Sequence, residues 1–193
     1  MKKSKRLKKS NTWKIKQHRD PFFKKSKTLG YRSRASFKLI ELNEKFNFIK
    51  KNTSLLDLGS SPGGWSQVAS KMITSGKILS IDIKSMRPIK NVKFINANIF
   101  DQITKNQILV FFPKKLDVIV SDMAADTTGN KSLDSIRTNQ LCFEIMNFSS
   151  QILKTNGILV SKLFMGDDFL EVKNLAKSLF KYVDFFKPLS SRN

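Results

Sequence analysis

A short apolar run that passes directly into a glycine-rich turn limits this chain to few folds. The run Leu55–Leu58 is followed at once by Gly59, Ser60, Ser61, Pro62, Gly63 and Gly64. Three glycines among six residues let the backbone turn sharply and approach a ligand closely. The pattern then predicts a helix over 62–73, with Pro62 near its first turn, where a missing N–H costs little. This order of strand, tight turn and helix is typical of α/β folds.

Strand-like and helix-like apolar patterns alternate along the rest of the chain. They predict a first helix over 33–48 and, after the strand at 55–58, further strands over 77–83, 92–97, 116–121, 158–164 and 182–187. Helices are predicted between them over 62–73, 99–111, 134–153 and 169–180, the third followed by the stop signal Asn156–Gly157. Such alternation favours a mostly parallel sheet with helices on both faces. We therefore expect a Rossmann-like α/β fold whose ligands bind beyond the carboxyl ends of the strands.

Basic residues are concentrated at the start of the chain. The 193 residues carry 36 Lys and Arg against 15 acids, a net charge of +21, and residues 1–34 alone contribute +13. A Lys-rich composition also arises in AT-rich genomes, but the uneven placement favours a function, because a basic arm concentrates polyanions around a domain. We divide the chain into a basic N-terminal arm at 1–31, without regular structure, and a globular domain at 32–193. Nucleic acid is the expected partner.

The cysteine, the histidine and the apolar runs exclude several classes of protein. The sequence has one cysteine, Cys142, and one histidine, His18, so it holds neither a disulfide framework nor a zinc-ligand set. No apolar run approaches 18 residues, and no apolar stretch follows the first charges, which argues against a membrane span and a secretory signal. We expect a cytoplasmic, monomeric protein that holds no metal.

An acid at the end of the second predicted strand fits a cofactor that contains adenosine. Asp82 follows Gly59 by 23 residues, and an acid there can accept hydrogen bonds from both ribose hydroxyls. The turn lacks the second glycine of the dinucleotide fingerprint G-x-G-x-x-G, which disfavours a nucleotide-dependent dehydrogenase. Trp65 stands where a phosphate-binding P-loop has lysine. S-adenosylmethionine (SAM) contains adenosine but no phosphate, so it suits this turn.

Four motifs together carry a family resemblance. They are D-L-G-S-S-P-G-G-W-S-Q at 57–67, S-D-M-A at 121–124, S-K-L-F at 161–164 and K-P-L-S-S-R at 187–192. With them the chain resembles the FtsJ/RlmE family from about residue 31 to residue 192. The resemblance implies a SAM-dependent methyltransferase that acts on ribose 2′-hydroxyls in RNA, and on a uridine of 23S ribosomal RNA in bacterial members. We therefore expect ribosomal RNA as the partner, within the large ribosomal subunit or its precursor.

The resemblance also implies a catalytic Lys-Asp-Lys-Glu tetrad. Lys38 in R-A-S-F-K-L matches the first lysine, Asp122 the aspartate and Lys162 the second lysine. The pattern of residues supports Lys162 independently, since it falls within the fifth predicted strand, where an unpaired ammonium is costly to bury. A lysine can remove a hydroxyl proton only if its pKa falls. Lys38 would lower the pKa of Lys162 and Asp122 would raise it, and the sequence does not decide between them.

The resemblance and the glycine turn together assign the cofactor contacts, which are Gly59, Gly63, Trp65, Asp82, Asn98 and Asp122. In the family pattern Gly63 and Trp65 line the methionine side of SAM, and Asp82 holds the ribose. An acid that binds the adenine amino group is expected where this chain has Asn98. An amide oxygen still accepts such a hydrogen bond, so we expect binding to survive with lower affinity.

The sequence departs from the family pattern at its end. The family continues past S-S-R to the tetrad glutamate and a final strand, whereas this sequence ends at Asn193. We therefore expect a truncated final strand, an unpaired sheet edge beside 182–187, and reduced rather than abolished activity.

Two alternatives remain open at this point. One is a catalytically weakened or inactive RNA-binding or ribosome-assembly factor on a methyltransferase scaffold. The other is a methyltransferase with a protein or base substrate. An enzyme that methylates base amino groups is expected to carry Asn/Asp-Pro-Pro-aromatic after the fourth strand, where this chain has Asp122-Met123-Ala124-Ala125.

The arm and the first predicted helix supply basic residues beside the expected site, namely Lys24, Lys25, Lys27, Arg32, Arg34 and Lys38. Such charges hold RNA phosphates with little reading of sequence. Specificity would then come from the shape of the RNA and from an exposed target nucleotide.

Overall fold

One sheet of five parallel strands runs through the part of the chain that this computed structural model describes, residues 19–191. The strand order is β3-β2-β1-β4-β5, with β1 at the centre. The strands are β1 (Leu55–Leu58), β2 (Ile78–Asp82), β3 (Val92–Asn96), β4 (Leu116–Ser121) and β5 (Leu153–Ser161). The predicted α/β fold with a parallel sheet is confirmed.

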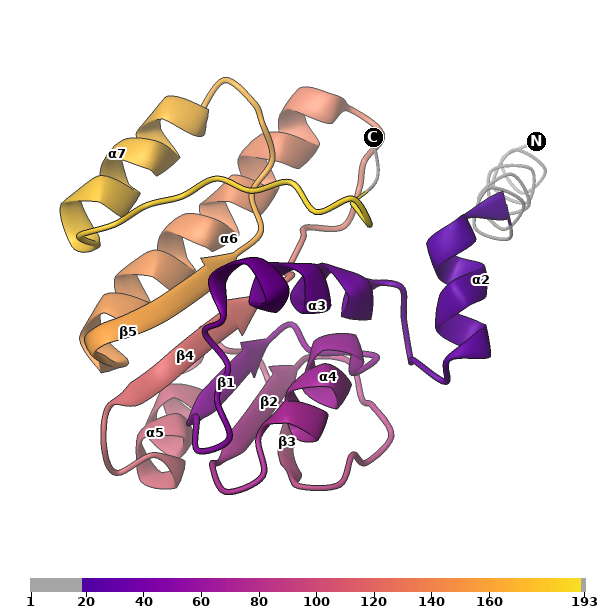
Figure 1. Cartoon of the computed structure of the whole chain (residues 1–193). Helices are drawn as coiled ribbons and strands as arrows, with labels where there is room; N and C mark the ends of the chain where they lie inside the picture. The colour runs from indigo at the N-terminus through magenta and orange to yellow at the C-terminus, as the bar shows by residue number, and fades with distance from the viewer. Residues whose placement is uncertain (1–18, 192–193) are drawn as a thin grey trace.

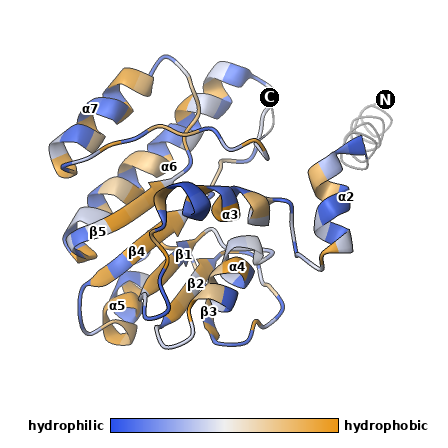
Figure 2. Cartoon of the chain, viewed as in Figure 1, coloured by the Kyte–Doolittle hydropathy of each residue, from blue (hydrophilic) through white to orange (hydrophobic). Residues whose placement is uncertain are grey.

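Helices cover both faces of the sheet, as predicted (Figure 1). The helices of the described part are α2 (Pro21–Thr28), which stands apart from the sheet, α3 (Ala35–Phe46), α4 (Gly64–Met72), α5 (Gln102–Phe111), α6 (Lys131–Ile152) and α7 (Phe169–Leu179). Apolar side chains of α3 and α4 bury one face of the sheet, and those of α5 and α6 bury the other. The inner strands β1, β2 and β4 are buried almost throughout, because neighbours cover them on both sides, and hydrophobic residues dominate the sheet in Figure 2. None of the helices between residues 19 and 191 combines the length and apolarity that crossing a membrane requires.

The register of the strands brings their carboxyl ends together at one edge. Leu58 at the end of β1 pairs with Ile81 of β2 on one side and with Ser121 of β4 on the other. Ser121 in turn pairs with Ser161 of β5. The residues that come next along each strand therefore meet at this edge, and they are Gly59, Asp82, Asp122 and Lys162.

The arm contains more regular structure than the sequence predicted. Residues 1–18 lie outside the described part, but 21–28 form α2, which the prediction of an arm without regular structure missed. Asp20 caps this helix by accepting hydrogen bonds from the N–H groups of Phe22 and Phe23, and Pro21 starts it. A short polar helix of this kind gives little apolar periodicity, so local capping rather than pattern reveals it.

The fifth strand also differs from the prediction. β5 spans Leu153–Ser161 rather than 158–164, and it follows α6 without a loop. Asn156 adopts a left-handed conformation (φ 63°) inside the strand instead of ending the helix, and the pairing of β4 with β5 is irregular there. Lys162 consequently lies one residue past the strand, not within it, although its N–H still donates to the Ser121 carbonyl at 2.9 Å.

The predicted sixth strand at 182–187 is wrong. In the described part of the chain, residues 181–191 form no strand, and β5 is an edge strand that pairs with β4. This C-terminal segment runs instead toward α3 (Figure 1). The ring of Phe186 packs edge-on against Phe46 with centroids 6.0 Å apart, and Glu41 accepts the N–H groups of Leu189 and Ser190. A side chain of α3 and a ring contact thus hold the C-terminal segment against this helix.

Candidate functional site

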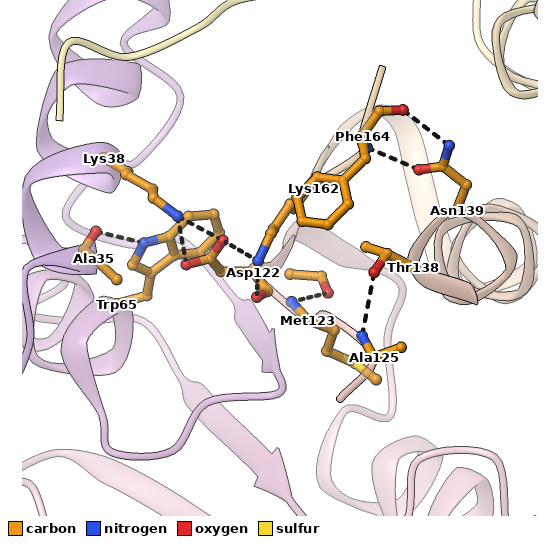
Figure 3. A network of polar contacts seen from close by, with 11 residues as sticks. Ala35, Lys38, Trp65, Asp122, Met123, Ala125, Thr138, Asn139, Lys162 and Phe164 are labelled. Carbon is orange, nitrogen blue, oxygen red and sulfur yellow. Dashed lines mark hydrogen bonds and ion pairs between the residues drawn. The ribbon is translucent and has the colours of Figure 1, made fainter. Parts of the chain in front are cut away.

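Two lysines and one aspartate meet at the carboxyl edge of the sheet. The Nζ atom of Lys38 lies 2.9 Å from each carboxylate oxygen of Asp122. The Nζ atom of Lys162 lies 3.6 Å from Asp122 Oδ1 and 3.5 Å from the Asp122 carbonyl oxygen. Figure 3 shows both ammonium groups directed at this one carboxylate. The three side chains that sequence reasoning selected from distant segments are therefore brought together.

The surroundings of Lys162 determine the direction in which its pKa shifts. Burial lowers the pKa of Lys162, Asp122 opposes this shift, Lys38 adds to it, and the net direction is downward. The three side chains are between 20% and 24% exposed, so a substrate can reach them while much of the water is excluded. Lys162 is therefore easier to deprotonate than an ordinary lysine.

Each member of the cluster is held by its own element. Lys38 projects from α3, which Trp65 of α4 anchors by donating its indole N–H to the Ala35 carbonyl at 2.7 Å. Asp122 follows β4, and the Ser121 hydroxyl accepts the N–H of Met123 at 3.3 Å. Strand pairing and helix packing thus set the spacing of the cluster.

The glycine turn lies directly beside this cluster. Gly59 and Gly63 both have positive φ angles, 70° and 103°, which side chains rarely adopt. A Cβ on Gly59 would lie 2.2 Å from the Cγ atom of Met123, and one on Gly63 would lie 2.9 Å from the Cδ1 atom of Ile89. The turn therefore depends on glycine at both positions, and its backbone approaches the loop that follows Asp122.

Asp82 closes the other side of the turn. One of its carboxylate oxygens accepts the N–H of Ser61 at 2.8 Å, and the other accepts that of Lys84 at 2.7 Å. Each oxygen keeps a lone pair for a further donor, such as a ribose hydroxyl. Asn98 lies two residues beyond β3, and its Oδ1 atom accepts the N–H of Phe100 at 3.1 Å.

Trp65 occupies a more buried position than a ligand-lining role alone would require. Its side chain belongs to the core cluster between α3, α4 and the sheet, and the residue is 5% exposed. Its packing therefore fixes the start of α4 and the adjoining glycine turn. A contact between Trp65 and a cofactor stays a prediction.

Sequence reasoning missed a buried acid behind the turn. Asp57 is 1% exposed, and the Ser66 hydroxyl, which also contacts the Ser80 hydroxyl, donates to it at 2.5 Å. Burial raises the pKa of Asp57 to about 7, against the opposing hydrogen bond from Ser66, and the charges of Asp122 and Asp82 add to the rise. The available signal was an acid among the leucines of β1.

The polar residues of α6 were also missed. Thr138 and Asn139 are buried, at 1% and 0% exposure, on the face that continues through Cys142 and Met146. Thr138 accepts the N–H of Ala125, and Asn139 binds the backbone of Phe164. A polar pair inside an apolar helical stripe was the signal that could have marked them.

Comparisons with known proteins converge on one family. The family model described as FtsJ-like methyltransferase matches residues 31–193. A protein from Pelagibacter ubique named ribosomal RNA large subunit methyltransferase E is 46% identical over 183 residues, which cover 95% of this chain and 90% of that protein. A protein of the same name from Rickettsia canadensis is 41% identical over 98% of this chain and 86% of its own length. A crystal structure described as a ribosomal RNA methyltransferase from Plasmodium falciparum has a TM-score of 0.75 and 35% identity, over 81% of this chain and 91% of that one.

Proposed function

Since the chain belongs to the FtsJ-like methyltransferase family, we propose that it transfers a methyl group from SAM to the 2′-hydroxyl of a uridine in 23S ribosomal RNA. The observation that carries this proposal is the pair of lysines that share the carboxylate of Asp122 next to the glycine turn. The names of the relatives support ribosomal RNA as the substrate. Lys38, Asp122 and Lys162 lie together at one edge of the sheet, which favours an active enzyme over an inactive assembly factor.

The residues of the glycine turn fit SAM. Gly59 and Gly63 have no side chain, so a ligand can approach the backbone of the turn closely. Asp82 has lone pairs that can accept hydrogen bonds from the ribose hydroxyls of the cofactor. Asn98 would accept the adenine amino group, and Trp65 and Asp122 would border the methionine part. SAM supplies an electrophilic methyl group on a sulfonium centre.

Lys162 would act as the base. In its neutral form it accepts the proton of the ribose 2′-hydroxyl while the oxygen forms a bond to the methyl carbon. The electrons of the broken carbon–sulfur bond stay on sulfur, and the proton later passes from Lys162 to water. Lys38 and Asp122 would position the base: Asp122 holds Lys162 in place, and Lys38 keeps a second positive charge near it.

Basic residues around the site would hold the RNA. Lys24, Lys25 and Lys27 lie on α2, which packs against α3 through the rings of Phe22 and Phe37, 5.6 Å apart. These charges are placed to contact phosphates beside a target ribose at Lys38 and Lys162. We extend this role to the whole basic arm at 1–31, attached to a catalytic domain at 32–193. An RNA substrate of this kind also implies that the reaction takes place in the cytoplasm.

Methyl incorporation from labelled SAM tests the proposal. Unmethylated large ribosomal subunits serve as substrate, and nuclease mapping with mass spectrometry locates the modified ribose. Lys162→Ala should lose at least 100-fold in rate, roughly the share of general base catalysis, and the exposed α7 variant Lys177→Ala serves as the control. Equal rates for wild type and Lys162→Ala would remove Lys162 as the base. Methylation of a base rather than a ribose, or none at all, would overturn the proposal.

A further inference from the structure

Asn139 of α6 is a buried amide that binds both backbone polar groups of one residue. Its Nδ2 atom donates to the Phe164 carbonyl at 2.9 Å, and its Oδ1 atom accepts the Phe164 N–H at 2.8 Å. The second Nδ2 hydrogen is donated to Asp168 Oδ1 at 2.8 Å. Asn139 is fully buried, so these bonds are shielded from water. Phe164 lies beyond the end of β5, where no strand pairing would bind its N–H and C=O groups.

This bonding fixes the Phe164 ring beside the candidate base. The ring centroid lies 5.4 Å from the Nζ atom of Lys162. Asp122 approaches the same ammonium at 3.6 Å, and Lys38 reaches it across Asp122. Figure 3 shows the sequence of contacts from Asn139 through Phe164 to Lys162 and Asp122. The charged groups that act on Lys162 are Asp122, at the end of β4, and Lys38, from α3.

The same turn of α6 also holds the loop that follows Asp122. Thr138, the residue before Asn139, accepts the N–H of Ala125 at 3.3 Å through its hydroxyl. Ala125 lies three residues after Asp122, and Phe164 lies two residues after Lys162. Two consecutive helix residues therefore anchor both loops that leave the catalytic cluster. A rigid helix sets positions more accurately than loops alone, so α6 determines how the two loops lie relative to each other.

We propose that Asn139 is a positioning residue that, through the backbone of Phe164, holds the Phe164 ring as an apolar wall against Lys162. The effect of Asn139 on methyl transfer rests on the proposed function, whereas its effect on the position of Phe164 does not. The wall limits water at the ammonium, which favours the neutral form. The face of the ring also attracts the charged form. Because burial is the largest influence on Lys162, removal of the wall should favour the charged form.

Nuclear magnetic resonance of protein labelled with [ε-13C]lysine tests the proposal without relying on activity. The Lys162 signal is assigned by its absence from Lys162→Arg, and its pKa is followed by titration. Asn139→Ala and Phe164→Ala should both raise the pKa of Lys162 by about one unit, while Phe164→Leu, which keeps an apolar wall, should not raise it. Asn147→Ala is the matched control, because Asn147 is an exposed asparagine on the same helix.

The pH dependence of methyl transfer gives a second readout. A rise of one unit in the pKa of Lys162 moves the acidic limb of the rate profile one unit upward and lowers kcat about tenfold at a fixed pH below it. The KM for SAM should stay unchanged, since Asn139 and Phe164 lie outside the glycine turn. A Lys162 pKa that is unchanged in both Asn139→Ala and Phe164→Ala would overturn the proposal, and so would an equal rise in Asn147→Ala. If the wild type transfers no methyl group, the proposed function fails, whereas the titration still decides the role of Asn139.

Discussion

Replacing Asp57 by Asn should change how the stability of the protein depends on pH. Burial raises the pKa of Asp57 from 3.8 to about 7, so the folded state retains a proton that the unfolded state releases at lower pH. The group favours folding most at low pH, and its contribution is lost as pH rises from the unfolded pKa toward the folded one. The slope is about 1.4 kcal/mol per pH unit between the two values, or about 3 kcal/mol from pH 5 to pH 7.

Urea unfolding, followed by the fluorescence of the buried Trp65, measures this effect at pH 5, 6, 7 and 8. Asn cannot lose a proton, and it still accepts a hydrogen bond from the Ser66 hydroxyl. The free energy of unfolding of Asp57→Asn should therefore increase relative to that of the wild type as pH rises. Asp184→Asn removes the same charge at an exposed position and serves as the control. A difference between Asp57→Asn and wild type that stays constant from pH 5 to pH 8 would refute the reasoning.

Four further outcomes are expected from other sites. Burial alone would raise the pKa of Asp117, but hydrogen bonds from Lys154 and from a backbone N–H lower it. Asp117→Asn should therefore cost about 0.5 kcal/mol above pH 4, and this difference should fade as pH falls through the lowered pKa of Asp117, as read from urea midpoints. Glu41→Ala should cost about 1–2 kcal/mol and speed carboxypeptidase cleavage of the C-terminal segment, because two backbone donors lose their acceptor. Asn98→Asp should tighten SAM binding about tenfold in calorimetry, since a carboxylate accepts the adenine amino group more strongly. Deleting residues 1–27 should weaken RNA binding at moderate salt more than SAM binding, and unchanged RNA affinity would count against a role for the arm.

Much of the candidate site could be predicted because its signals are local. The turn after β1 needs glycine for its positive φ angles, and Asp82, Asp122 and Lys162 stand at the end of a strand or directly after one. Parallel pairing then carries Asp82, Asp122 and Lys162 to one edge. Lys38 was assigned from motif resemblance, since nothing in a helical pattern shows which face of α3 will meet Asp122.

The errors have a common physical origin. The segment at 182–187 has the apolar content of a strand, but the Phe186 ring packs against Phe46 of α3, and Glu41 of α3 binds the backbone that follows at Leu189 and Ser190. The start of β5 was missed because helix and strand meet there with no turn residue between them. Such choices depend on which surfaces are left uncovered after the rest of the chain has packed.

The amino-acid sequence by itself determined the parallel α/β fold and the glycine turn, because periodicity and backbone conformation act over a few residues. Lys38, Asp122 and Lys162 were selected as site residues by motif resemblance, and their roles stay a prediction. Only the tertiary structure decided the direction in which the pKa of Lys162 moves, since that depends on burial by groups far apart in sequence. It alone also placed the Asn139 side chain against Phe164 and raised the pKa of the buried Asp57. Desolvation and charge proximity are properties of the assembled edge of the sheet, and no short stretch of sequence contains them.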